Sequence, residues 1–242
     1  MQWYFPTKFI LQKKNSENSN HIEKRAGTHQ IPILQTPENW MIADSTPLLH
    51  LLDSRLPARK FYPPGLIGLL SAVVEEYFDE WIPRLAIWSR WASDEETAVD
   101  ASEKMAMLMM GKSMPAVAQN MQQWGKRAVR AVGMSSIHQQ EEGEKELLRL
   151  FSSLDTQLQN AQLTKTGNET KRFIFGQVPT AADCVVYGCC SAHFMRDLYP
   201  RRVLQHLTTW HAALKSVHDP VLSSVSIERM KPNDSLPPFV EL

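Results

Sequence analysis

Two short apolar runs on either side of a turn occupy residues 31–43. Residues 31–34 form an apolar, β-branched run, residues 37–39 favour a turn, and residues 40–43 form a second apolar run. Short runs of this kind around a turn are typical of the two strands of a β-hairpin. The pattern therefore predicts a hairpin.

A further helix is expected directly after the hairpin. Thr46 is a suitable N-cap residue, and Pro47 suits the first helical position. The leucines that follow recur at the spacing of one helical face. They are Leu48, Leu49, Leu51, Leu52 and Leu56.

From residue 66 to about residue 217, apolar residues recur at helical spacing throughout. Pro83 should kink or end the first of these helices, and Gly111 should divide the second helical region. One apolar stripe is made of Leu147, Leu148, Phe151, Leu154 and Leu158. The expected helical segments are 66–91, 105–110, 115–132, 144–163, 180–195 and 203–217. This succession predicts an all-α region.

The two patterns meet at residues 57–64, where prolines interrupt both. We therefore expect an α/β domain over residues 1–58 and a helical domain over residues 65–230. Residues 231–242 contain prolines and are expected to form an irregular tail.

Composition and charge narrow the class of protein. At 242 residues with 43% hydrophobic residues, the chain can bury one or two sizeable cores. Lys plus Arg and Asp plus Glu number 26 each, so the net charge indicates neither a nucleic-acid partner nor an anionic membrane. The apolar runs are too short to span a membrane, and the N-terminus has no signal-peptide pattern. A cytoplasmic protein is the expectation.

The cysteines are not arranged for a disulfide framework or a metal site. Cys184, Cys189 and Cys190 form no Cys-x-x-Cys pair and share one expected helix. They are expected to be reduced, packed side chains, and no metal is predicted.

The hairpin also carries groups that can bind a ligand. Pro32 has no amide hydrogen, so the bond entering this strand suggests an edge, a bulge or a cis peptide, and a cis bond would expose the Ile31 backbone. Asp44 and Ser45 precede a helix N-terminus, where amides and the helix dipole attract a carboxylate. Asp44 can also accept from an ammonium. The set suits a zwitterionic peptide end, although a turn proline and a helix cap would explain the same residues.

A second motif lies at residues 173–183. Thr180 followed by Asp183 is a capping-box variant with an acid in place of the usual Glu or Gln. Val178 is placed to act as an apolar staple. We expect Asp183 to be a folding determinant rather than a catalyst.

Together these motifs resemble the glutathione transferase family over nearly the whole chain. Gln30, Ile31 and Pro32 look like the family's cis-proline segment, and Asp44 with Ser45 looks like its acid-serine pair. Residues 176–183 are similar to its capping box and staple. The resemblance implies a thioredoxin-like N-terminal domain, an all-helical C-terminal domain, and glutathione as co-substrate bound by Gln30, Ile31, Pro32, Asp44 and Ser45.

The resemblance also implies the second substrate and its pocket. In the family, the first long helix of the helical domain lines the pocket for a small hydrophobic electrophile. Trp88 and Trp91 are the candidates for that apolar wall, with ordinary core packing as the alternative. A cytoplasmic detoxification enzyme is implied, and a homodimer is compatible with it.

One departure from the family concerns the catalytic residue. The family's catalytic Tyr, Ser or Cys ends a first strand, whereas residues 3–11 look like the end of the first helix and the second strand, and residues 19–26 look like the second helix. No residue matches the catalytic position, so none is assigned. Either Met1 is not the true start, which we favour, or the domain is a non-catalytic interaction or scaffold module. Thiol-disulfide or dehalogenase chemistry would need an N-terminal cysteine, and none precedes Cys184.

Overall fold

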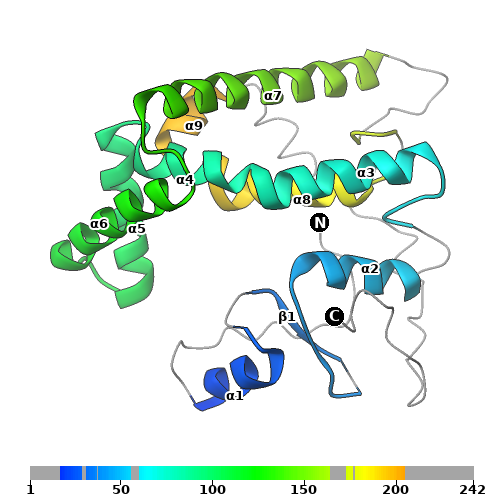
Figure 1. The fold of residues 1–242 in the computed structure, drawn as a ribbon, viewed down its shortest axis with the longest axis horizontal. Coiled ribbons are helices and arrows are strands. Elements are labelled where there is room, and N and C mark those ends of the chain that lie inside the picture. The colour runs from blue at the N-terminus through cyan, green and yellow to red at the C-terminus, as the bar shows by residue number, and fades with distance from the viewer. Residues whose placement is uncertain are drawn as a thin grey trace. The chain divides into compact units, whose positions relative to one another are not determined.

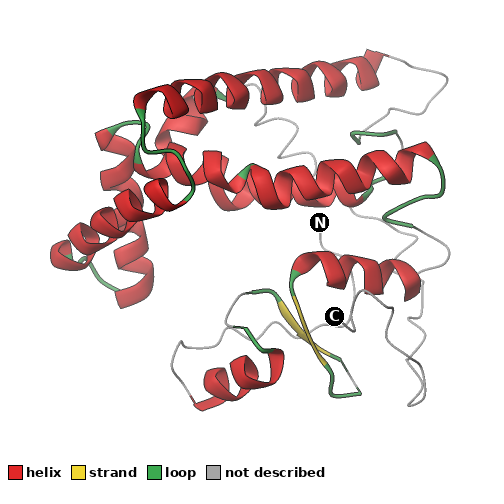
Figure 2. Cartoon of the chain, in the orientation of Figure 1, coloured by secondary structure: helices red, strands yellow, loops and turns green. Residues whose placement is uncertain are grey.

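The computed structural model describes residues 17–28, 31–36, 38–55, 60–163, 173–176 and 178–204. These residues fall into two compact units, the first ending at Pro63 and the second starting at Pro64. The described chain is mostly helical and has one two-stranded antiparallel sheet, as Figures 1 and 2 show. This is the coarse mixture of α/β and all-α structure that the sequence predicts. The expected tail at residues 231–242 lies outside the described residues.

The first unit contains the predicted hairpin between helices. Its elements are α1 (Glu17–Ala26), β1 (Ile33–Gln35), β2 (Met41–Ala43) and α2 (Ser45–Arg55). The strands pair antiparallel, with Ile33 opposite Ala43 and Gln35 opposite Met41. The hairpin and both helices are therefore confirmed. Burial of apolar side chains joins β2 to α2 in a small core made of Ile42 and Leu51, with Trp40 and Leu48 packed against them.

The predicted N-cap of α2 is wrong by two residues. The helix begins at Ser45, and Asp44 Oδ1 accepts a hydrogen bond from the backbone N–H of Thr46 at 3.0 Å. A carboxylate ahead of the first turn satisfies an amide that has no partner within the helix. Pro47 then occupies the third helical position, where its missing N–H removes no intrahelical bond.

The second unit is a helical assembly around one apolar core. Its elements are α3 (Leu66–Glu76), α4 (Pro83–Trp91), α5 (Glu95–Met110), α6 (Pro115–Ala131), α7 (Ile137–Leu163), α8 (Ala181–Cys189) and α9 (Leu198–Val203), with π-helical turns at Tyr77–Trp81 and Cys190–Phe194. In Figure 1, α3 and α8 lie side by side, and they are in contact. Among the most buried core side chains are Ile82, Leu85, Leu147, Phe151 and Phe194.

The expected helix at residues 66–91 is interrupted where Pro83 predicts an interruption. Pro83 cannot donate to a carbonyl in the preceding turn. The N–H of Ile82 instead reaches the carbonyl of Tyr77, five residues back, at 3.0 Å. The result is a π-helical turn after α3 and a new helix that begins at Pro83. The break is confirmed, but the π-helical turn was not predicted.

Two helices begin earlier than predicted because their caps were missed. Asp94 Oδ1 accepts from the N–H of Thr97 at 2.7 Å, so α5 starts at Glu95 rather than at residue 105. Ser136 Oγ accepts from the N–H of Gln139 at 3.2 Å, and Gln139 Oε1 accepts from the N–H of Ser136 at 2.9 Å. This reciprocal capping box starts α7 at Ile137 rather than at residue 144.

The apolar stripe predicted for α7 is partly wrong. Leu147 and Phe151 are fully buried and Leu154 is nearly so, but Leu148 is 40% exposed and faces away from the core. The side chain of Leu158 lies outside the described residues. At the end of the chain, α9 covers residues just before the expected helix at 203–217, and residues 205–217 are not described.

The capping box of α8 is confirmed, and it is fully buried. The Asp183 carboxylate accepts from the N–H of Thr180 at 2.9 Å, from the Thr180 hydroxyl at 3.1 Å, and from the N–H of Ile174 at 2.9 Å. The staple assignment is wrong, because Val178 is 48% exposed while Pro179 is buried. Asp183 thus connects the turn at residues 173–176 to the start of α8.

Candidate functional site

A hydrogen bond joins the two ends of the hairpin that carry the predicted ligand groups. The Ile31–Pro32 peptide bond is cis. The Asp44 N–H donates to the carbonyl of Pro32 at 3.1 Å, so the proline segment and the start of α2 are neighbours. Asp44 adopts a positive φ of 78°, a conformation that Asp tolerates better than most residues. Gln30, the remaining predicted ligand residue, lies outside the described residues.

The polar groups at this corner are accessible. Asp44 is exposed and Ser45, the first residue of α2, is half-buried, while the Ile31 side chain is 87% exposed. The start of a helix offers unpaired N–H groups and a positive dipole end, both of which favour a bound carboxylate. An exposed Asp beside it can accept from an ammonium. The arrangement can therefore hold the two charges of an amino-acid head group a short distance apart.

Trp88 and Trp91, the predicted wall of a substrate pocket, are core side chains. They are 4% and 6% exposed, respectively. Trp88 and Tyr199 pack in an edge-to-face arrangement with their ring centres 5.7 Å apart, and Trp91 and Trp124 do so with their ring centres 6.0 Å apart. Their burial is explained by aromatic packing between helices. A contact with an electrophilic substrate stays a prediction.

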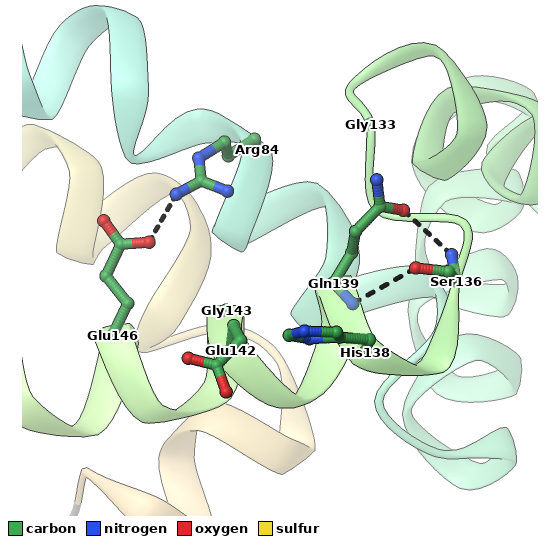
Figure 3. A pocket seen from close by; sticks show the side chains of 8 residues that line it. All are labelled: Arg84, Gly133, Ser136, His138, Gln139, Glu142, Gly143 and Glu146. Carbon is green, nitrogen blue, oxygen red and sulfur yellow. Dashed lines mark hydrogen bonds and ion pairs between the residues drawn. The ribbon is translucent and has the colours of Figure 1, made fainter.

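The second unit has a pocket of its own beside the start of α7. It has an open volume of about 410 Å³, and none of the predicted site residues lines it. Figure 3 shows its lining side chains, with Arg84 on one side and the first three turns of α7 on the other. The lining residues are Arg84, Gly133, Ser136, His138, Gln139, Glu142, Gly143 and Glu146.

A network centred on Glu146 forms one wall of this pocket. Its carboxylate accepts from the Tyr77 hydroxyl at 2.7 Å and from Trp81 Nε1 at 2.8 Å, and it forms an ion pair with Arg84. The Arg84 guanidinium also lies 3.9 Å from the centre of the Trp81 ring. Burial, and then the hydrogen bond to Glu146, raise the pKa of Tyr77 to about 12. Tyr77 is therefore a donor at neutral pH and not a base, and the network serves to hold α7 against the π-helical turn.

Cys184, Cys189 and Cys190 form no disulfide bond in the structure. Burial raises the pKa of the Cys184 and Cys189 thiols to about 12, and raises that of Cys190 well above its ordinary value. Because the thiolate is the reactive form, none of them is suited to act as a nucleophile at neutral pH.

Over the described ranges, no group of three or more His, Cys, Asp or Glu side chains is arranged to bind a metal. No helix among the described elements has the length and apolar character needed to cross a bilayer.

A partly buried histidine predicts how stability depends on pH. His193 lies beside Arg90, which donates to Asp197 at 2.8 Å and to the carbonyl of Ala192 at 3.1 Å. Burial, then the positive charges of Arg90 and Arg196, lower the pKa of His193 from 6.5 to about 4. Between these values the unfolded chain binds the proton and the folded chain does not, so stability falls as the pH drops through this range.

We expect this protonation to lower the free energy of unfolding on the order of 2 kcal/mol between pH 7 and pH 4.5. The His193→Gln variant should lose that part of the pH dependence, as measured by urea unfolding at both pH values. His138→Gln, at an exposed position on α7, is the matched control and should follow the wild type. Parallel pH profiles for the wild type and His193→Gln would contradict the assignment.

The chain was compared with protein-family models, with curated proteins and with solved structures, and none of the three comparisons found a match. A functional conclusion therefore depends on the residues and their geometry alone.

Proposed function

We propose that this protein binds glutathione at the corner formed by Ile31, Pro32, Asp44 and Ser45. We further propose that glutathione is conjugated there to a small apolar electrophile, as the glutathione transferase family does. The observation that supports the proposal most directly is the hydrogen bond from the Asp44 N–H to the Pro32 carbonyl. It joins two motifs that the resemblance to glutathione transferases separately implies to be glutathione ligands.

The chemistry of the corner suits the γ-glutamyl end of glutathione. The α-carboxylate would accept from the Ser45 hydroxyl, at the positive end of the α2 dipole. The ammonium would pair with the exposed Asp44 carboxylate. The ligand's own peptide backbone would hydrogen-bond to the exposed chain at Ile31, with Gln30 beside it. The two opposite charges of the zwitterion would thus bind to two different groups at the start of α2.

Conjugation needs a thiolate in addition to a binding site. The glutathione sulfur would attack the electrophilic carbon as a thiolate, and either a leaving group departs with its electron pair or a proton is added to the product. A donor that lowers the thiol pKa is required for this step, and no such residue is assigned. The protein's own cysteines are not alternative nucleophiles, because their thiols are buried and protonated.

Charge removal at Asp44 is the sharpest test of binding. Asn tolerates the same positive φ and caps a helix as well as Asp does, so Asp44→Asn removes the charge with little effect on the cap. We expect Asp44→Asn to weaken glutathione binding at least about tenfold, since hydrogen bonds to charged groups contribute about 1.5–3 kcal/mol. Combined with Ser45→Ala, it should abolish binding in a calorimetric titration.

Ser54→Ala is the matched control for the serine. Ser54 lies at the other end of α2 and donates to the carbonyl of Leu51 at 2.7 Å, away from the corner. Its substitution should leave glutathione affinity unchanged, and circular dichroism should show all variants folded. If Asp44→Asn with Ser45→Ala binds glutathione as the wild type does, the proposed site is wrong.

A non-catalytic interaction module is the second candidate. One face of α3 exposes apolar residues at helical spacing, with Leu66 67%, Leu69 62% and Val73 57% exposed. A stripe of this kind favours contact with another protein, and a second copy of the chain is the simplest partner. This candidate is favoured if glutathione does not bind and if Leu69→Asp with Val73→Asp lowers the molar mass measured by light scattering.

A further inference from the structure

The chain is neutral overall, but one stretch contains no acidic residue. From residue 104 to residue 140 there is no Asp or Glu. The stretch contains five basic residues, Lys104, Lys112, Lys126, Arg127 and Arg130, and seven of the eleven methionines. It covers the end of α5, all of α6 and the start of α7. Positive charge and soft apolar side chains are therefore concentrated at the end of α5 and along α6, whereas the first part of α5 carries the acidic residues Glu95, Glu96, Asp100 and Glu103.

The last turn of α5 exposes apolar side chains on every side. Met107 is 48% exposed, Leu108 81%, Met109 62% and Met110 46%. Successive residues of an α-helix are rotated by about 100°, so four in a row face all directions around the axis. Because all four side chains are exposed, no described element fully covers any side of this turn. We call residues 107–110 the apolar tip.

Basic side chains border the apolar tip and continue along α6. Lys112 follows the left-handed Gly111 that ends α5, and it is exposed. On α6, Ala118, Gly125 and Val129 face the core. The exposed side of the helix carries the basic set Lys126, Arg127 and Arg130, with Trp124 46% exposed at its margin. In Figure 1 the two helices form one end of the second unit.

We propose that the α5–α6 hairpin docks on an anionic lipid bilayer. The apolar tip would enter the boundary between head groups and acyl chains, and the basic side chains of α6 with Lys112 would contact the negative head groups. Trp124 has the amphipathic ring that is favoured at such an interface. This inference does not depend on glutathione binding, because all of its residues lie in the second unit.

The shape of the tip favours a bilayer over a protein partner. A helix that docks in a protein groove presents one apolar face and keeps the other polar. The tip instead exposes apolar groups all around the axis, as insertion into a fluid apolar layer requires. The neutral net charge is no objection, because screening at physiological salt limits each charge to about 8 Å and the local charge decides.

The test is sedimentation of the full chain with lipid vesicles. The expected result is that phosphatidylcholine vesicles containing phosphatidylserine bind the protein, that pure phosphatidylcholine binds it much less, and that added salt weakens binding. Absence of binding to the phosphatidylserine vesicles, or equal binding to both compositions, would overturn the proposal.

Two variants separate the apolar and the electrostatic contributions. Leu108→Asp with Met109→Asp should abolish sedimentation, whereas Leu148→Asp, at an exposed apolar position of α7, should not. Charge reversal of Lys126, Arg127 and Arg130 to Glu should weaken binding on the order of a hundredfold, since each basic residue near an anionic surface contributes about 1 kcal/mol. The same reversal at Lys24, Lys145 and Arg201, which are exposed outside the hairpin, is the matched control.

Light scattering without lipid tests whether the apolar tip instead binds a second copy of the chain. If the wild type forms a dimer that Leu108→Asp with Met109→Asp dissociates, the tip is an interface between copies and the membrane proposal is overturned. If the tip variants sediment with vesicles as the wild type does, it is overturned as well. Circular dichroism of each variant confirms that loss of binding is not loss of fold.

Discussion

Replacing Asp183 by Ala is expected to lower the free energy of unfolding by about 3 to 5 kcal/mol, because each buried group left without a partner costs about 1–3 kcal/mol. The carboxylate accepts from the backbone N–H of Ile174, and from the backbone N–H and the hydroxyl of Thr180. All three residues are buried, so water cannot replace the lost acceptor. Urea unfolding followed by circular dichroism measures the loss.

Asp183→Asn separates the hydrogen bonds from the charge. Asn keeps one acceptor oxygen but turns an N–H₂ group toward the donors of Thr180, so an intermediate loss of about 2 kcal/mol is expected. Glu103→Ala, at an exposed acidic position of α5, is the control and should stay within about 0.5 kcal/mol of the wild type. A loss below about 1 kcal/mol for Asp183→Ala would show that the buried carboxylate does not anchor α8.

Local motifs were predictable because all their information lies within a few residues. Thr180 and Asp183 are three positions apart, and the structure gives them the capping box that their types predict. The β-hairpin follows for the same reason, since two short apolar runs and a turn determine both strands. The starts of α5 and α7 were not predicted, although their signals are equally local. They are the N-cap Asp94 before Glu95 and the capping box of Ser136 and Gln139, and apolar periodicity alone does not reveal either.

Features that depend on distant residues could not be predicted in this way. The Glu146 network joins Tyr77, Trp81 and Arg84 across more than sixty residues of sequence. Periodicity placed the tryptophans of α4 on a helix but could not say whether that helix faced a pocket or the core.

The corner formed by Ile31, Pro32, Asp44 and Ser45 depends both on local motifs and on a contact between residues apart in the sequence. Its two halves are local motifs, whereas the contact between Asp44 and Pro32 requires the hairpin to close in the right register. The resemblance to glutathione transferases implied that both motifs bind one ligand, but not the hydrogen bond between them. It supplied no catalytic residue, because no residue of the sequence was matched to the family's catalytic Tyr, Ser or Cys.

Gly125→Ala is the second substitution with a large expected effect. A Cβ at this position would lie 2.6 Å from Cγ of Trp91 and closer still to two other carbons of the same ring. The Trp91 ring is 6% exposed and contacts Trp124, so it cannot move aside without disturbing α4 and α6. We expect a net loss of about 2 to 3 kcal/mol in the free energy of unfolding, because overpacking outweighs the roughly 1 kcal/mol of helix propensity that Ala gains over Gly.

Two other helical glycines are matched controls, because helix propensity alone predicts the same effect of a Gly→Ala substitution at all three positions. At Gly143 the nearest atom is the terminal methyl of Met134, which can rotate away, and Leu85 Cδ2 is 3.1 Å distant, so Gly143→Ala should change stability by less than about 1 kcal/mol. At Gly188 nothing lies within 4 Å, and Gly188→Ala should stabilise the protein by about 0.5 to 1 kcal/mol.

A double-mutant cycle identifies the cause of the loss at position 125. Trp91→Leu removes the ring carbons that a Cβ would meet, so Gly125→Ala should cost much less in that background than in the wild type. Additive effects of the two substitutions would mean that the destabilisation has a source other than the Trp91 ring. Equal losses at Gly125, Gly143 and Gly188 would contradict the packing of α6 against α4 in this region.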